Sequence, residues 1–132
     1  MSDLARTTGG PDGPPVHLEH ASWDDLQTMV HDRLVLDVER GLAAQRRGDL
    51  AETDRQLSHA LDIVAEFQRS LPVDDFRGGY GLGALYDFLQ RRLVLARVGR
   101  DTAITDECLG LVTDLCAGWR EVVAGRQDRQ SA

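Results

Sequence analysis

Apolar residues recur every three or four positions over most of the chain, with polar residues between them. This spacing is the period of an α-helix with one buried face. It predicts four helices, at about 22–47, 50–71, 82–98 and 102–124. The fourth has the most regular pattern, with steps of 4, 3, 1, 3, 4, 3 and 1 between its apolar residues: Ile104, Cys108, Leu111, Val112, Leu115, Trp119, Val122 and Val123.

The first helix has signals at both of its ends. Ser22 with Asp25 three residues later has the form of a capping box, which predicts a helix start there. Gly48 ends the first helix, and the side chain of Asp49 can cap the second. The connection between these two helices is therefore expected to be very short.

The later boundaries are marked in the same way. Pro72 stops the second helix, because proline cannot continue the helical hydrogen bonds. Gly99 stops the third helix, and Asp101 or Thr102 can cap the fourth. No segment alternates polar and apolar residues as a strand does. Since most connections are short, the sequence predicts an all-α fold, an antiparallel four-helix bundle.

The two ends of the chain differ in composition from this helical part. The first twenty residues contain many glycines and prolines and few apolar residues, which predicts a flexible N-terminal arm. We therefore expect three parts: an arm at 1–20, a helical bundle at 21–125 and a disordered tail at 126–132.

Charge and composition exclude several functions. The net charge is −7 and every basic residue is an arginine, so no basic patch for a nucleic acid is expected. The sequence has no apolar run long enough to span a bilayer and does not begin like a secretory signal. We expect a cytoplasmic protein without membrane insertion. Cys108 and Cys116 would lie about 12 Å apart on one helix, too far for a disulfide, and are expected to be buried reduced thiols.

Glycines cluster before the third helix, and glycine-rich loops can bind phosphates. Gly79, Gly81 and Gly83 form G-x-G-x-G, but no strand precedes them and the chain contains no lysine for a Walker loop. A connection that lets the third helix dock explains the glycines more simply. A nucleotide-binding enzyme nevertheless stays as an alternative, which thermal-shift screening with nucleotides would test.

No constellation of catalytic or metal-ligating residues stands out. His17 and His20 could share one turn, but nothing nearby completes a metal site, and His59 lies on another helix. The carboxylates fall mostly on polar helix faces, where solvation explains them. The sequence therefore predicts neither an enzyme nor a cofactor.

Two helices carry more apolar surface than a bundle of this size needs. The third presents eight apolar or aromatic residues over about half of its circumference: Leu82, Leu85, Tyr86, Phe88, Leu89, Leu93, Leu95 and Ala96. The first is similarly wide. These faces either form a groove for a partner or the chain's own arm, or bury one another in a tightly wrapped bundle or a homodimer.

Three blocks of sequence resemble the flagellar secretion chaperone family FliS. They are "ASWDDLQTMVHDRL", "LGALYDFLQRRLVLARVGRD" and "LGLVTDLCAGWREVV". The second is similar to the family pattern L-x-x-L-Y-D-Y-x-x-R-R-L-x-x-A-N-x-x-x-D, and the three occur in the family's order. The resemblance spans about residues 20 to 124.

This resemblance implies a cytoplasmic export chaperone with no cofactor. Members of the family bind the C-terminal segment of flagellin on apolar grooves, prevent its premature polymerisation and deliver it to the type III flagellar export apparatus. Flagellin is thus the expected partner and the export apparatus a second one, and we expect a monomer or weak homodimer. The alternative is a homo-oligomeric helical adaptor that does not bind flagellin.

The residues expected to contact flagellin are the surplus apolar ones together with two arginines that could hold peptide carbonyls or carboxylates. They are Leu26, Met29, Val30, His31, Leu34, Tyr86, Leu89, Arg92, Leu93 and Arg97. The side chains of Leu85, Leu115 and Trp119 are expected to lie in the core instead.

Overall fold

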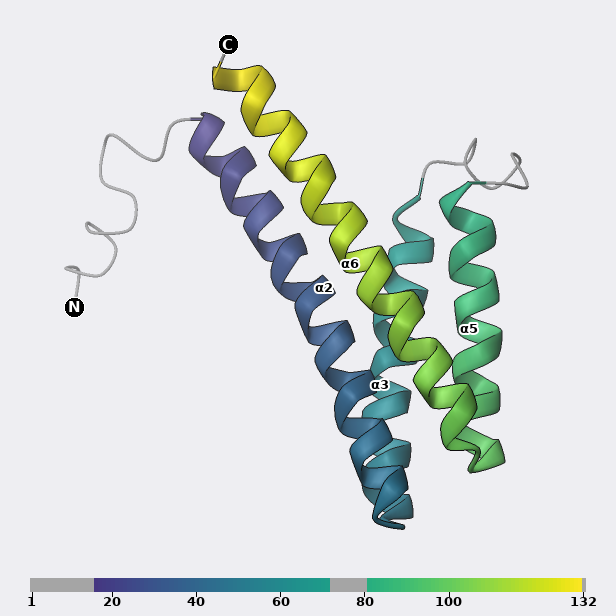
Figure 1. Cartoon of the computed structure of the whole chain (residues 1–132). Coiled ribbons are helices and arrows are strands. Elements are labelled where there is room, and N and C mark those ends of the chain that lie inside the picture. Colours follow the sequence, from purple (N-terminus) through teal and green to yellow (C-terminus); the bar gives the residue numbers. More distant parts are fainter. Residues whose placement is uncertain (1–15, 72–80, 132) are drawn as a thin grey trace, which may run out of the picture.

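The computed structural model of the protein describes residues 16–71 and 81–131, and over these ranges it contains helices and no strand (Figure 1). The helices are α2 (Val16–Arg46), α3 (Leu50–Arg69), α5 (Leu82–Gly99) and α6 (Thr102–Ser131). The prediction of an all-α four-helix bundle is confirmed.

The four helices run alternately down and up and close into a ring. α2 packs against α3 and α6, and α5 packs against the same two helices. α2 and α6 contain 31 and 30 residues, whereas α3 and α5 contain 20 and 18. The two long helices therefore extend past the two short ones at one end of the bundle, where α2 begins and α6 ends (Figure 1).

The turn between α2 and α3 has the geometry that its residues predict. Gly48 has a φ of 76°, in the left-handed region that glycine adopts without strain. A side-chain oxygen of Asp49 accepts a hydrogen bond from the backbone N–H of Glu52 over 3.1 Å. The predicted helix end and N-cap are both confirmed.

The turn between α5 and α6 differs from the prediction in one residue. Gly99 is the last helical residue, as expected, but the left-handed residue that follows it is Arg100, with a φ of 56°. Asp101 caps α6, because its carboxylate accepts a hydrogen bond from the N–H of Ala103 over 2.9 Å. Of the two candidate caps, Asp101 is the one used.

Both outer helix ends were predicted wrongly. α2 begins at Val16, six residues before the predicted capping box at Ser22, directly after Pro14 and Pro15 in the sequence. α6 continues to Ser131, so residues 126–131 of the predicted disordered tail are helical. Near these ends the two long helices are joined, since Arg126 on α6 donates to the carboxylate of Asp24 on α2 over 2.7 Å. Most of the predicted arm lies outside the described residues, and the division of the chain into domains stays a prediction.

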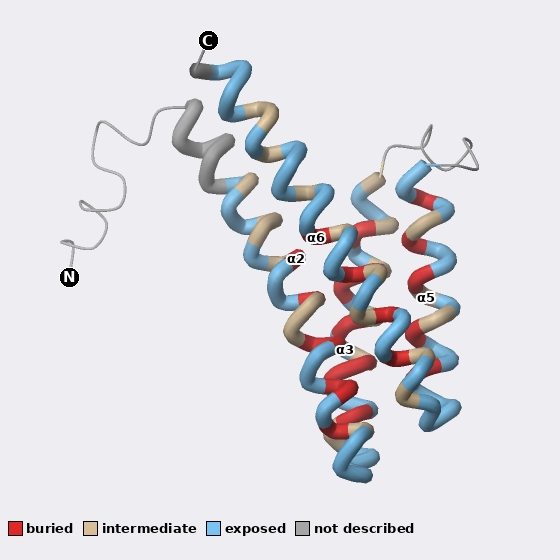
Figure 2. Tube along the Cα trace, viewed as in Figure 1, coloured by how far each residue is buried: buried red, intermediate tan, exposed pale blue. Residues whose placement is uncertain are grey.

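The core consists mainly of leucine, valine and alanine, in keeping with the small number of aromatic residues. Figure 2 shows the positions of the buried residues along the four helices. It includes Leu34, Leu89 and Leu93, none of which has any exposed surface. These three were predicted to contact a partner. Each side chain is completely enclosed by the bundle, so in this structure they belong to the core, and their contact with a partner stays a prediction.

Candidate functional site: an apolar pocket at the open end of the bundle

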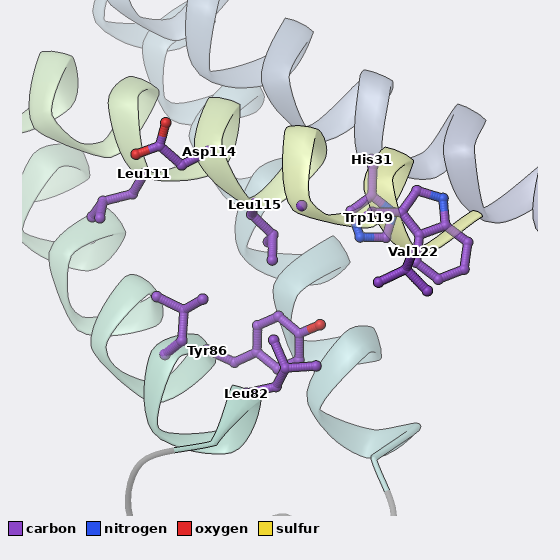
Figure 3. Close-up of a pocket in the computed structure, with 10 residues that line it drawn as sticks. His31, Leu82, Tyr86, Leu111, Asp114, Leu115, Trp119 and Val122 are labelled. Carbon is purple, nitrogen blue, oxygen red and sulfur yellow. The ribbon is translucent and has the colours of Figure 1, made fainter. Parts of the chain in front are cut away.

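A pocket of about 470 Å³ opens between α5 and α6, with α2 at one end of it (Figure 3). It lies toward the end of the bundle where α2 and α6 extend past the other helices. Its lining is almost entirely apolar: Leu82, Leu85, Tyr86, Leu111, Leu115, Gly118, Trp119 and Val122, together with His31 and Asp114.

The α5 wall comes from the first turns of that helix. Leu82, Leu85 and Tyr86 are three and four residues apart, so they share one face. Tyr86 is 6% exposed, and its ring centre lies 5.7 Å from that of Phe67 on α3. Tyr86 is therefore both a core residue and a wall of the pocket, and burial raises the pKa of its hydroxyl.

Three residues expected in the core lie only partly buried, in the walls of the pocket, and Leu115 also packs against the core cluster. Leu115 and Trp119 on α6, and Leu85 opposite them, were expected to be enclosed by the bundle. All three are only partly buried, and all three line the pocket. The regular stripe on α6 is thus divided by depth: Cys108 and Val112 lie in the core, whereas Leu115, Trp119 and Val122 face the pocket.

An aromatic stack forms the end of the pocket at α2. The imidazole of His31 lies between Phe67 and Trp119, with ring centres 4.4 Å and 5.2 Å away and interplanar angles of 23° and 5°. Trp23 meets Trp119 edge to face at 6.2 Å. These rings come from three helices and from distant parts of the sequence, so no local pattern could have grouped them.

Hydrogen bonds fix the orientation of Trp119. Its indole N–H donates to the hydroxyl of Thr28 over 2.8 Å, and that hydroxyl donates to the backbone carbonyl of Asp24 over 2.9 Å. The guanidinium of Arg126 lies 5.5 Å from the centre of the Trp119 ring, within range of a cation–π interaction. The indole is thus held on both its edge and its face.

His31 is the least exposed polar side chain that lines the pocket. Nδ1 lies 2.7 Å from the backbone carbonyl of Gln27, and since a carbonyl can only accept, Nδ1 carries the proton. Burial lowers the pKa of His31 below its usual value, although the bond to Gln27 and the charge of Asp32 oppose this effect. The imidazole is therefore neutral at pH 7.

Leu26, Met29 and Val30 were also predicted to contact a partner. The side chains of Leu26 and Met29 are 55% and 64% exposed, but neither lines the pocket. Met29 instead borders a shallow hollow on α2 with Asp32, Arg33 and Leu36. Val30 is partly buried against the core. The structure thus brings only His31 and Tyr86, of the ten predicted residues, together in the pocket.

The two arginines make ion pairs within the bundle. Arg92 donates two hydrogen bonds of 2.8 Å to the carboxylate of Glu107, which joins α5 to α6. Arg97 donates to Asp54 over 2.5 Å, which joins α5 to α3. Each guanidinium already has a carboxylate partner, so holding a bound peptide would require it to share or exchange that partner.

Within residues 16–71 and 81–131, no three His, Cys, Asp or Glu side chains are grouped to hold a metal ion. The two cysteines are unpaired and buried, as predicted, and burial raises the pKa of Cys108 to about 11 and raises that of Cys116 as well. None of the helices in the described ranges combines the length and hydropathy of a membrane-spanning segment. The pocket is suited to non-covalent binding of apolar groups.

Comparison with known proteins identifies relatives of this bundle. The sequence profile of the family described as flagellar protein FliS matches residues 16–126. The flagellar secretion chaperone FliS of Bacillus subtilis (strain 168) is 27% identical over 113 residues, which cover 85% of this chain and 84% of that protein. The flagellar secretion chaperone FliS of Salmonella typhimurium (strain LT2) is 27% identical over 105 residues, 77% of each chain.

Proposed function

The chain belongs to the FliS family of flagellar proteins, and we propose that it is a cytoplasmic chaperone of flagellar export that binds the C-terminal segment of flagellin. Both relatives are named as flagellar secretion chaperones, and their matches cover most of this chain. The proposal extends that role to this protein and assigns the binding to the pocket between α5 and α6.

The apolar pocket is the observation that carries the proposal. Its volume of about 470 Å³ lies within the range typical of ligand sites, about 300–1,000 Å³. Leu82 and Val122 at its rim are 46% and 48% exposed. A surface of this kind suits the apolar face of an amphipathic helix laid between two bundle helices. Such a helix would gain its order on binding, as segments that are disordered alone commonly do.

Holding this segment would keep flagellin from polymerising in the cytoplasm until it reaches the type III export apparatus. Binding alone is sufficient for this role. The pocket accordingly needs no cofactor, and the segment could leave its apolar walls without any covalent bond being broken.

Calorimetry with purified flagellin would test the proposal. We expect binding at micromolar concentrations or tighter, and its loss when the C-terminal segment of flagellin is removed. Val122→Asp should abolish binding without loss of helix content, because it places a charge at the apolar rim. Val94→Asp is a matched control, since Val94 has nearly the same exposure, 47%, on the outer face of α5. Absence of binding by the unmodified protein would contradict the proposed function, and equal losses in the two variants would contradict the assignment to the pocket.

A homo-oligomeric adaptor is the second candidate, because α5 has a further apolar surface. Phe88, Val94, Leu95 and Val98, on the side of α5 away from the core, are 44–68% exposed. A second copy of the chain could cover this strip. Light scattering would then show a dimer that persists on dilution and that Leu95→Asp disrupts. A monomer at all concentrations would exclude this candidate.

A further inference from the structure

The pocket lining offers one imidazole acceptor, Nε2 of His31. The other polar groups of the lining are the Tyr86 hydroxyl, the Trp119 indole N–H, which donates to Thr28, and the carboxylate of Asp114, which is exposed to solvent. His31 is 5% exposed, and Figure 3 shows it beside Trp119 at the end of the pocket opposite Leu82 and Tyr86. It therefore faces whatever enters between the two walls.

The ring of His31 is held in one orientation. Phe67 and Trp119 stack on its two faces, and the bond from Nδ1 to the carbonyl of Gln27 fixes its rotation. Since Nδ1 carries the proton, Nε2 of the neutral ring has a free lone pair and can only accept a hydrogen bond.

Nε2 is not enclosed by the bundle, and His31 lines the pocket. Within residues 16–71 and 81–131, the only hydrogen bond of the imidazole is the one from Nδ1. No fully enclosed side-chain nitrogen or oxygen in that part of the chain lacks a partner, so Nε2 is not sealed inside the bundle. A bound segment that covered Nε2 without donating to it would leave a buried acceptor unsatisfied, at a cost in affinity.

We propose that His31 Nε2 selects, among apolar segments, those that present a hydroxyl or side-chain amide N–H donor at this point, and that binding therefore requires the neutral imidazole. The inference rests on the proposed function and assigns a specificity-determining residue to the same pocket. Serine, threonine, asparagine and glutamine side chains of the bound segment supply such a donor.

Acid should then weaken binding, because a protonated His31 loses its only acceptor and places a charge under an apolar segment. The surroundings do little to hold that proton. Asp32 on α2 already accepts two hydrogen bonds of 2.6 Å from Arg120 on α6, and Asp114 is exposed. α5 presents the neutral hydroxyl of Tyr86, α3 presents the uncharged ring of Phe67, and beyond Trp119 the charges of Arg126 and Asp24 are paired with each other.

Two substitutions separate the acceptor from the shape of the ring. His31→Phe keeps an aromatic ring for the stack but has no acceptor, whereas His31→Gln keeps an acceptor that does not titrate. At about pH 8, we expect His31→Phe to bind the C-terminal segment of flagellin about fivefold more weakly than the unmodified protein and His31→Gln to bind within about twofold. From pH 8 to about pH 5, the affinity of the unmodified protein should fall by up to about tenfold per pH unit below the His31 pKa, while both variants stay nearly constant.

Two further measurements make the test independent of how well a variant folds. In the unmodified protein, the His31 pKa followed by NMR should fall when the segment binds. Segments in which the donor side chains are replaced one at a time by alanine should include one that loses about fivefold in affinity for the unmodified protein but nothing for His31→Phe. His59→Gln is the matched control, because His59 contacts Asp37 away from the pocket and should not alter the pH dependence of binding.

The outcomes distinguish this inference from the proposed function. Binding that His31→Phe leaves unchanged in strength and in pH dependence, or a His31 pKa that does not fall in the complex, would overturn the inference and leave the chaperone function intact. Absence of binding by the unmodified protein at every pH would overturn both.

Discussion

The two ends of the bundle are made from the same four helices but are packed very differently. At the closed end, where α2 turns into α3 and α5 into α6, all four helices lie together around buried residues (Figure 2). At the open end, α2 has no buried residue from Trp23 to Val30, and α6 has none from Ala117 to Gln130. The bundle thus has one end that is filled and one that still exposes apolar surface.

Close packing at the closed end depends on small residues and on a buried polar link. A Cβ atom on Gly41 of α2 would lie 2.7 Å from Leu57 Cδ2, so glycine permits the approach of α3. Gln45 of α2 donates to the carbonyl of Ala96 over 2.9 Å and accepts from the hydroxyl of Thr105 over 2.5 Å. One side chain therefore connects α2, α5 and α6.

Large aromatic residues take the place of small ones at the open end, and they leave space between the helices. His31 of α2 stacks on Trp119 of α6, Trp23 of α2 meets Trp119 edge to face, and α5 lies opposite across the pocket. This difference indicates that packing at the closed end provides most of the stability of the fold. The open end can then expose apolar surface for a partner without unfolding the bundle. Three predictions follow from this division.

The largest difference in the effect of substitution should be between two leucines on α5. Leu93→Ala removes a fully buried side chain and should lower the free energy of unfolding by about 2–5 kcal/mol. Leu85→Ala, in the pocket wall, should cost only about 1 kcal/mol but should weaken flagellin binding by about tenfold. Urea denaturation and calorimetry measure the two effects. A larger loss of stability in Leu85→Ala than in Leu93→Ala would show that the open end, and not the closed end, holds the fold together.

Glycines give a second contrast with a smaller effect. Gly41→Ala should lower the free energy of unfolding by about 1–2 kcal/mol, since overpacking against Leu57 exceeds the gain in helix propensity. A Cβ atom added at Gly118 or at Gly110 would have no other atom within 4 Å. Each glycine-to-alanine substitution should therefore raise the free energy of unfolding by up to about 1 kcal/mol, because alanine favours the helix.

Gly118 and Gly110, both on α6, should differ in how their substitution changes flagellin binding. Gly118 lines the pocket and Gly110 does not. Titration with flagellin should therefore show weaker binding for Gly118→Ala and unchanged binding for Gly110→Ala. The assignment of the pocket fails if the two variants bind equally well.

The smallest effect expected is on the pH dependence of folding. Because the pKa of His31 is lowered in the folded state, the unfolded chain takes up a proton first as the pH falls below 6.5. Above pH 6.5, His31 should therefore not change the free energy of unfolding. As the pH falls from 6.5 to the lower pKa of the folded state, the free energy of unfolding should decrease. Denaturation curves at a series of pH values should show a shallower acid slope for His31→Gln, and identical slopes would contradict the burial of a neutral imidazole.

Some features of the fold could be predicted from the sequence and others could not, and individual residues show why. Asp49 and Gly48 were predicted correctly because capping and a left-handed turn depend on neighbouring residues. The ends of α2 and α6 were predicted wrongly, because the local signals at Ser22 and after residue 124 do not stop these helices, which continue to Val16 and Ser131. Leu85 and Leu93 show the same limit within one helix, since both belong to its apolar face and only one is enclosed.

The sequence by itself determined the helices, most of their turns and the all-α class, because helical period, caps and breakers act within a few residues along the chain. Its resemblance to FliS, carried by the order of three blocks, also indicated the family. Only the tertiary structure decided which apolar residues are core and which line a pocket, because that depends on how far each helix extends beside its neighbours. It also placed His31 between Phe67 and Trp119, because rings on three different helices come together only when the helices pack into the bundle.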